Sequence, residues 1–182
     1  MKKNKVITSM KKSTKRKALV IASMASMLDN FNLKNIELLD NMGYEIILAA
    51  NFKCEDSNSD EKINNFYYEM DQKGYKIIQI DFSRYITNIK KQICSFNQLR
   101  KLAEDRYDLI HCNSPICAAM TRFVFKKARK EGCKVIYTAH GFHFYKGAPI
   151  KNWLIFYPIE KICSRWTDVL ITINKEDFYL AK

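Results

Sequence analysis

Short apolar runs alternate along the chain with longer segments in which apolar residues recur every three or four positions. The short runs, which are typical of buried strands, are residues 18–25, 44–50, 76–81, 108–112, 134–139 and 168–173. The longer segments, which are typical of helices, are residues 28–41, 61–73, 87–104, 115–131 and 150–165. Alternating strands and helices form βαβ units around a parallel sheet. The pattern therefore predicts an α/β fold, a doubly wound, mostly parallel Rossmann-like sheet of about six strands with helices on both faces.

Several element boundaries carry residues suited to them. Gly43, Gly74 and Gly132 each follow a helical segment and precede a strand, where glycine takes the left-handed conformation without strain. Ser114 stands before a proline, as expected for a capping hydroxyl at a helix start. Ser26 and Asp29 are candidates to cap the segment 28–41 in the same way.

The carboxyl ends of the predicted strands should share one edge of the sheet, because crossovers between parallel strands are right-handed. Ligands of open α/β sheets bind at this edge. His140 directly follows the strand 134–139, and Gly141 allows a sharp turn and a close approach to a ligand. A loop histidine bonded to nearby carbonyl oxygens is the alternative. The residues expected at this edge are Ser26, Asn51, Phe82, Asn113, His140 and Asn174.

The charge balance favours anionic partners. The 182 residues, about one domain, contain 31 Lys and Arg against 19 Asp and Glu, a net charge of +12. Eight basic and no acidic residues stand in positions 1–17, so residues 1–16 are expected to form a disordered basic arm before a domain at 17–182. The arm and the apolar run after it also imitate a secretory signal, but that run suits a first strand. The six cysteines form no CxxC pair, which favours reduced thiols in the cytosol.

Several cofactor and metal classes lack their sequence patterns. The turn at 23–29 contains no glycine, which disfavours a dinucleotide fingerprint, and no P-loop pattern is present. His111 and Cys112 could approach His140 and His143 at the sheet edge, but their spacing is not that of a zinc site, and we expect no metal. We expect His111 to be buried in its strand.

Two other interactions remain open. Basic residues gather at helix ends, as at 126–130, but no nucleic-acid motif accompanies them, and we expect no nucleic-acid partner. Seven aromatic residues between 142 and 166 are interleaved with Lys and Arg. Such a stretch either packs against the sheet or lies in a membrane interface, where the basic arm would add attraction to anionic lipid.

Three runs together resemble glycosyltransferase family 4, and within it the bacterial enzymes that build capsular and extracellular polysaccharide. They are YDLIHCNSP at 107–115, TAHGFHFYKG at 138–147 and DVLITINKED at 168–177, and they occur in the family's order. The resemblance covers about residues 17–182. It implies a GT-B enzyme of two Rossmann-like domains, of which this chain is the N-terminal, acceptor-side half. The donor-side domain would then be missing, as in a fragment, a truncated gene product or half of a split enzyme.

The resemblance also implies a reaction and a site. The reaction would move a sugar from a nucleotide sugar to a lipid-linked saccharide acceptor, with retention and without a metal, at the cytoplasmic face of the cell membrane. His140 would be catalytic and contact the donor sugar. Ser26, Met27 and Gly141 would lie on the donor side, and Asn113, Ser114, His143, Tyr145 and Lys146 on the acceptor side.

The chain departs from the family pattern in three places. The first loop lacks glycines, Asn113 stands where histidine is common, and Cys117 and Ala118 stand where glycines are common. We expect the isolated chain to be catalytically silent. The alternatives from other classes are a non-catalytic module that binds carbohydrate or lipid phosphate, and a basic nucleic-acid binder.

Overall fold

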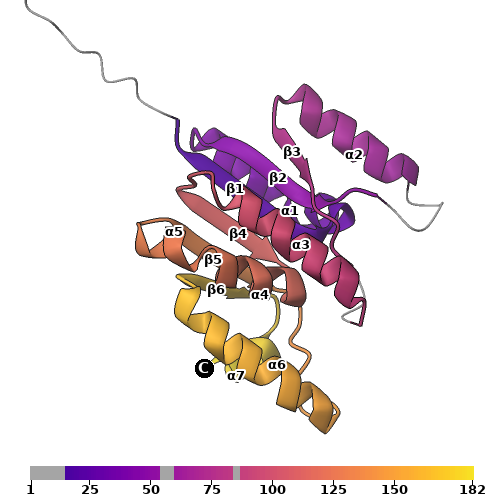
Figure 1. Cartoon of the computed structure of the whole chain (residues 1–182), viewed down its shortest axis with the longest axis vertical. Helices are drawn as coiled ribbons and strands as arrows, with labels where there is room; N and C mark the ends of the chain where they lie inside the picture. The colour runs from indigo at the N-terminus through magenta and orange to yellow at the C-terminus, as the bar shows by residue number, and fades with distance from the viewer. Residues whose placement is uncertain (1–14, 54–59, 84–86) are drawn as a thin grey trace, which may run out of the picture.

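One parallel sheet organises the molecule (Figure 1). The computed structural model describes residues 15–53, 60–83 and 87–182, so most of the predicted basic arm lies outside the described residues. The six strands are β1 (Lys17–Met24), β2 (Glu45–Asn51), β3 (Lys76–Gln79), β4 (Leu109–Asn113), β5 (Lys134–Ala139) and β6 (Val169–Thr172). They pair in the order β3-β2-β1-β4-β5-β6, and every pairing is parallel. The predicted α/β fold class is confirmed.

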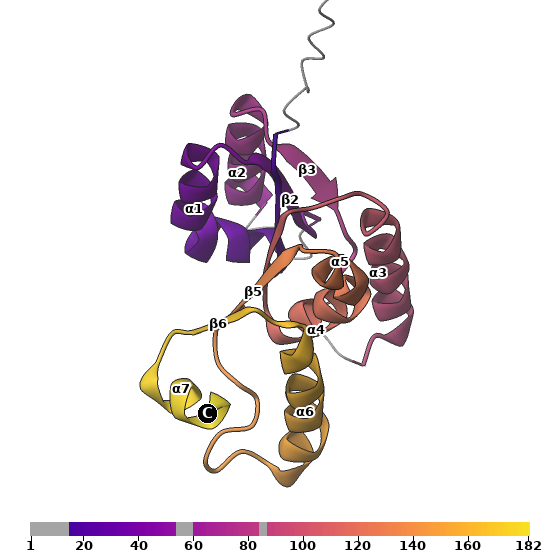
Figure 2. The ribbon, with the colours of Figure 1, turned by 90° about the vertical axis from the view of Figure 1, so that its left-hand side faces the viewer.

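The direction of the strand order reverses between β1 and β4, which places helices on both faces of the sheet. Figure 2 shows α1 (Ala25–Asn41) and α2 (Asp60–Gln72) on one side. On the other side lie α3 (Ile89–Leu102), α4 (Pro115–Val124), α5 (Lys126–Lys130) and α6 (Ile150–Cys163). A short helix, α7 (Lys175–Ala181), follows β6. The carboxyl ends of the paired strands β1 and β4 form the switch point at which sheets of this kind bind ligands.

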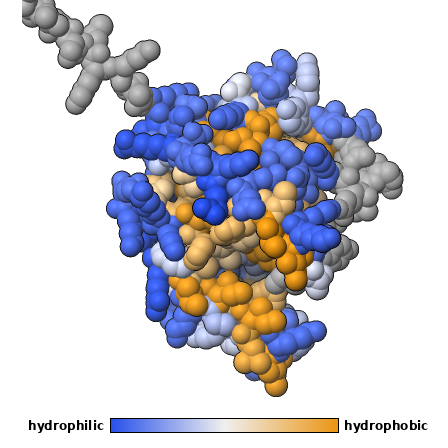
Figure 3. All heavy atoms as spheres, viewed as in Figure 1, coloured by the Kyte–Doolittle hydropathy of each residue, from blue (hydrophilic) through white to orange (hydrophobic). Residues whose placement is uncertain are grey.

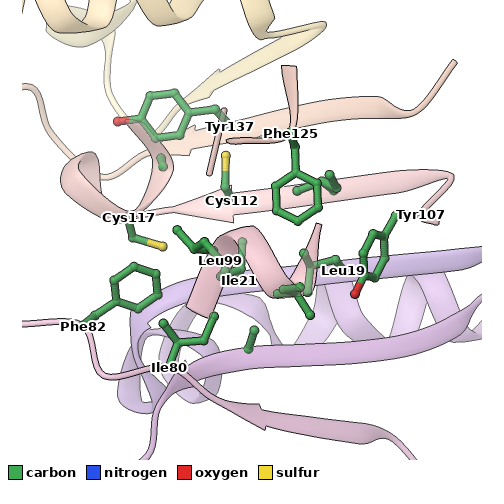
Figure 4. Packing of buried hydrophobic residues seen from close by; sticks show 14 of the residues in the cluster. Leu19, Ile21, Ile80, Phe82, Leu99, Tyr107, Cys112, Cys117, Phe125 and Tyr137 are labelled. Atoms are coloured by element: carbon green, nitrogen blue, oxygen red, sulfur yellow. The ribbon is translucent and has the colours of Figure 1, made fainter. Parts of the chain in front are cut away.

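The central strand β1 separates two hydrophobic clusters. Because successive side chains of a strand point to opposite faces, Leu19 and Ile21 join the cluster beneath α3 and α4, whereas Val20 joins the cluster beneath α1 and α2. Figure 4 shows the first of these clusters, in which the ring of Phe82 packs beside Cys117. Phe82 was expected at the carboxyl edge, but its side chain is buried in this core instead.

Two predicted helix starts are wrong in detail. Helix α1 begins at Ala25, directly after β1, and its N-cap residue is Met24, so neither Ser26 nor Asp29 caps it. Asp29 pairs instead with Lys62 of α2, at 2.9 Å. Ser114 does occupy the N-cap position of α4, but its side chain makes no capping hydrogen bond and instead accepts from the Ser23 hydroxyl.

The segment 115–131, predicted as one helix, is divided into α4 and α5 at Phe125. The ring of Phe125 is buried in the core and contacts the ring of Tyr107 edge-on, with 5.8 Å between centroids. Gly43, Gly74 and Gly132 have φ angles of 81°, 75° and 107°, which confirms their predicted left-handed conformation.

Arg16 lies before the predicted domain boundary at residue 17, but it contacts the sheet. The backbone oxygen of Arg16 accepts a hydrogen bond from the Glu45 N–H at 2.7 Å, and its guanidinium lies 4.4 Å from the centroid of the Tyr44 ring. Arg16, which we expected in the disordered arm, is therefore anchored to the start of β2. No helix within the described ranges is both long and apolar enough to cross a bilayer.

Candidate active site at the carboxyl edge

His140 lies at the end of β5, half-buried, and its ring is held by the end of the neighbouring strand. The Nε2 atom is 3.1 Å from Oδ1 of Asn113, the last residue of β4. The Asn113 amide nitrogen donates to the Ile21 carbonyl oxygen at 3.4 Å, so the amide oxygen faces the imidazole. Because an amide oxygen only accepts, His140 carries its proton on Nε2 when it is neutral. Nδ1 is then a lone-pair acceptor, and no described residue donates to it.

An aromatic ring from α1 covers the imidazole. The Phe31 and His140 ring centroids are 4.9 Å apart, with an angle of 54° between the ring planes. Phe31 is itself 55% exposed, so the ring pair stands at the rim of the sheet. Phe31 was not among the residues predicted for this edge. The signal available in the sequence was an aromatic residue early in a helical segment that follows a strand.

Both histidines near this edge are held uncharged. Burial lowers the pKa of His140. His111 lies in β4, with Nε2 2.8 Å from the Thr138 hydroxyl oxygen, and its pKa is lowered to about 4 by burial and, second, because the neighbouring His140 disfavours another positive charge there. The expectation that His111 is buried in its strand is confirmed. The edge therefore presents a neutral imidazole at physiological pH.

The backbone is bent where β4 and β5 leave the sheet. Among the described residues, Ser114 is the one non-glycine with positive φ, at 68°, and Gly141 has φ 128°. A non-glycine residue in this region costs about 1–3 kcal/mol and is typical of functional sites. The Ser114 hydroxyl accepts a hydrogen bond from Ser23 at 3.0 Å, which ties the turn to the end of β1. Ser23 is a further residue of this edge that was not predicted from the sequence.

The predicted donor-side residues lie around the same corner. Ser26 and Met27 form the first turn of α1, next to the Ser23–Ser114 contact. No side chain caps this helix end, and its first turn contains no acidic residue. The N-terminus of a helix attracts anions through its N–H groups and its dipole. Gly141 follows His140 directly, and α1 reaches His140 through the ring of Phe31.

The predicted acceptor-side residues divide into two groups. Asn113 and Ser114 lie at His140, as described above. His143 lies against α6, where its ring is 4.4 Å from that of Phe156 and its carbonyl oxygen accepts from Asn152. Tyr145 and Lys146 are exposed in the next turn, in which the backbone carbonyl oxygen of Tyr145 accepts from the Ala148 N–H. No described contact joins these three side chains to His140.

Asp177 fixes the start of this loop. This buried carboxylate accepts from the Phe142 N–H at 3.1 Å and also bonds with Asn174 at the start of α7. Asn174 caps that helix by accepting from the Asp177 N–H. The loop after His140 is therefore tied to the helix after β6.

The described residues contain no group of three or more His, Cys, Asp or Glu side chains arranged to hold a metal ion. His111 and Cys112, which we considered as possible ligands with His140, are adjacent in β4 and so point to opposite faces. Cys112 packs in the core beneath α4, where burial raises the pKa of its thiol to about 12.

Comparison with known proteins identifies the family. The model of Glycosyltransferase Family 4 matches residues 35–177. The chain belongs to this family. Within it, the chain is 38% identical over 168 residues to a protein of Bacillus subtilis (strain 168) named "Putative glycosyltransferase EpsD", a match that covers 92% of the chain and 40% of that protein. It is also 35% identical over 105 residues to an "Uncharacterized 41.2 kDa protein in cps region" of Klebsiella pneumoniae, covering 55% of the chain and 29% of that protein.

Two solved structures share the fold. The crystal structure of UDP-N-acetylglucosamine 2-epimerase superposes with a TM-score of 0.62 at 10% identity, over 92% of the chain and 43% of the epimerase. The Acinetobacter baumannii MurG structure gives a TM-score of 0.52 at 12% identity, over 88% of the chain and 42% of MurG. The family 4 chain thus spans less than half the length of these proteins and of its sequence relatives.

Proposed function

We propose that this domain is the acceptor-side half of a retaining glycosyltransferase that builds a bacterial capsular or extracellular polysaccharide. The reaction breaks the bond between the anomeric carbon and the diphosphate of a nucleotide sugar, and forms a bond from that carbon to an acceptor hydroxyl oxygen. The nucleoside diphosphate leaves, and the hydroxyl proton is released. The observation that carries the proposal is the neutral, oriented His140 at the carboxyl edge, held by Asn113 in a chain of family 4.

His140 acts on the donor sugar. Its bare Nδ1 accepts a hydrogen bond from a sugar hydroxyl near the anomeric carbon, and its lone-pair dipole stabilises the positive charge that develops on the ring. A protonated imidazole would oppose this charge, so the lowered pKa of His140 suits the role. Asn113 positions the ring and sets the tautomer.

The leaving diphosphate lies at the N-terminus of α1. The N–H groups around Ser26 and Met27 face anions favourably because no side chain caps this end. Gly141 has a φ of 128° and no side chain, so its backbone can approach the donor closely. We propose that no metal ion is needed at this corner, because the helix terminus and cations of the donor-side half neutralise the departing charge.

A lipid-linked saccharide is the proposed acceptor. Asn113 and Ser114 would contact the sugar near the reacting hydroxyl, and the loop that carries His143, Tyr145 and Lys146 would contact the rest of the saccharide or its phosphate. Such an acceptor places the enzyme peripherally at the cytoplasmic face of the cell membrane, on anionic lipid.

Turnover requires a second half. The chain covers 40% of the Bacillus relative, and we propose that the remaining part of such a protein carries most of the nucleotide-sugar site. The isolated domain should therefore not transfer sugar by itself.

A chimaera tests the proposal. All 182 residues are joined to the part of the Bacillus relative that follows the matched region, and release of nucleoside diphosphate is measured with a panel of nucleotide sugars and membrane lipid extract. The chimaera should turn over one donor, and His140→Ala should lower kcat about a hundredfold or more. Lys134→Ala, at the exposed amino end of the same strand, is the matched control and should leave kcat unchanged.

The alternatives give different outcomes in the same experiment. A non-catalytic carbohydrate or lipid-phosphate binding module would bind acceptor analogues and leave every donor intact in the chimaera. A nucleic-acid binder would show salt-dependent binding to polynucleotide and no donor turnover. Donor turnover that persists unchanged in His140→Ala would refute the role of His140.

A further inference from the structure

Helix α6 is apolar around its whole circumference but packs on one side only. Trp153 and Phe156 face the core. Six other large apolar side chains of α6 are exposed: Ile150, Leu154, Ile155, Tyr157, Ile159 and Ile162. The largest exposed fractions are 77% for Ile150 and 73% for Leu154. A helix that is apolar all round is normally enclosed by protein or by lipid.

The apolar surface continues from α6 across α4 to α3. A hollow of about 290 Å³ lies between the three helices, and its walls are almost entirely apolar. Its lining includes Phe96 of α3, Met120 and Phe123 of α4, Ile159 and Ile162 of α6, and Trp166. Ile89 and Ile93 extend the apolar surface along α3. We call this continuous surface of α3, α4 and α6 the apolar band. Figure 3 shows hydrophobic atoms running from the middle of this face to its lower end over α6.

The helices that carry the apolar band are strongly basic. Helices α3, α4, α5 and α6 together contain eleven Lys and Arg and one acidic residue, Glu160. Glu160 is turned inward and paired with the buried Arg122 at 2.8 Å, so it offers no negative charge to the surface. On the opposite face, α1 and α2 contain two basic and seven acidic residues. The positive charge of the domain is therefore gathered on the side that is apolar.

Cations at the edge of the apolar band lie over its aromatic rings. The Lys126 ammonium is 4.2 Å from the Phe123 ring centroid and 5.6 Å from that of Trp166. The Lys161 ammonium lies 3.5 Å from the Tyr157 hydroxyl. Long basic side chains and amphipathic rings take such positions where an apolar surface enters a bilayer and the charges reach the headgroups.

We propose that the apolar band rests on a phospholipid bilayer with anionic headgroups. The apolar side chains would enter the acyl boundary, and the basic residues around them would pair with phosphates. A second copy of this chain is a poor occupant, because it would bring another strongly basic face against this one. This inference rests on the proposed function and deepens it, because a lipid-linked acceptor would be presented from the same bilayer.

Vesicle binding tests the proposal with the full 182-residue chain. Wild-type protein should sediment with vesicles that mix phosphatidylglycerol with phosphatidylcholine, and only weakly with pure phosphatidylcholine. Replacing Leu154 and Ile155 by Asp should weaken binding to the mixed vesicles roughly tenfold or more. Leu38→Asp with Met42→Asp makes the same change at exposed positions at the C-terminal end of α1, on the opposite layer, and should bind like wild type.

Charge variants test the contribution of the basic residues to vesicle binding. Changing Lys126, Lys151 and Lys161 together to Gln should weaken binding about a hundredfold, since each basic residue near an anionic surface contributes about a factor of five. Lys34→Gln on α1, a single charge change on the opposite layer, is the control and should bind like wild type. The basic residues before position 17 are present in every variant, so the differences report on the band.

Two outcomes would overturn the proposal. One is a wild-type chain that binds neither kind of vesicle. The other is an Asp double variant that binds as well as wild type while the Gln variant does not, because charge alone would then hold the protein to any polyanion. Both results leave donor turnover by the chimaera unaffected, and an inactive chimaera that still binds vesicles would count only against the proposed function.

Discussion

The two helical layers pack on the same sheet but differ on their outer surfaces. The α1–α2 layer is acidic outside, whereas the α3–α6 layer is basic and carries the apolar band. Both layers bury apolar side chains of the same strands, as Leu19 and Val20 of β1 illustrate. The shared core therefore accounts for the fold, whereas the outer surfaces determine which partners each layer can contact.

The two sides of the sheet also differ in the charge of the basic side chain that each one buries. Arg122 of α4 is charged, stacks on Tyr137 at 4.2 Å and pairs with Glu160, which also accepts from the Tyr137 hydroxyl. His111 faces the α1–α2 side of the sheet and is neutral, with a hydroxyl as its partner. A buried charge needs a partner, but a buried imidazole can instead lose its proton.

Removing the charge of Arg122 should have the largest effect on stability. Arg122→Leu leaves Glu160 largely buried without its counter-ion, and we expect the free energy of unfolding to fall by about 3–5 kcal/mol. Equilibrium denaturation in urea measures it. The double variant Arg122→Leu with Glu160→Leu should recover much of the loss, because it leaves no unpaired charge. A loss below about 1 kcal/mol in the single variant would show that the pair is not effectively buried.

The free energy of unfolding should fall in acid because of His111. The pKa of folded His111 is about 4, below the usual value near 6.5, so the unfolded chain binds more protons between these pH values. The contribution of His111 is complete above about pH 6.5 and is lost as the pH falls toward 4, by about 3 kcal/mol in total. His140, whose pKa is also lowered, adds in the same direction.

Denaturation curves across this pH range measure the effect of His111. The variant His111→Gln, which can still bond to Thr138, should show a shallower loss of stability with acid than wild type. Equal slopes in the two proteins would mean that folding does not lower the pKa of His111.

The smallest effect concerns the helix starts. Asn88 caps α3 by accepting from the Lys91 N–H at 3.2 Å, whereas Met24 leaves the start of α1 without a side-chain cap. Asn88→Ala should cost about 1 kcal/mol of unfolding free energy, and Met24→Ala should cost nothing through capping. Thermal unfolding followed by circular dichroism compares the two. A similar loss in both variants would argue against an anion-ready terminus at α1.

The sequence predicted the fold better than the site. Apolar periodicity located every strand, because buried parallel strands are apolar on both faces. It placed His140, Asn113 and Ser114 at one edge, because chain order and crossover handedness determine which strand ends share it. It could not predict that Phe31 covers His140, since this depends on α1 starting without a turn after β1.

The same limit applies to His143 and to the apolar band. His143 follows His140 by three residues, but the loop carries it to Phe156 of α6. The aromatic stretch at 142–166 left packing and membrane contact open as alternatives, and the structure divides the two roles among its residues. Trp153 and Phe156 pack inward, while Leu154 and Ile155 face outward. Which side of a uniformly apolar helix is buried depends on its neighbours.

A double-mutant cycle on His140 and Asn113 in the chimaera tests the central claim most directly. The account predicts that Asn113 affects kcat only by holding the His140 ring, whereas its proposed contact with the acceptor contributes to KM. Each single Ala variant should then lower kcat for donor turnover, and the kcat of the double variant should be no lower than that of His140→Ala. Multiplicative losses in the double variant, or full activity in His140→Ala, would contradict the assignment of this pair as the catalytic unit.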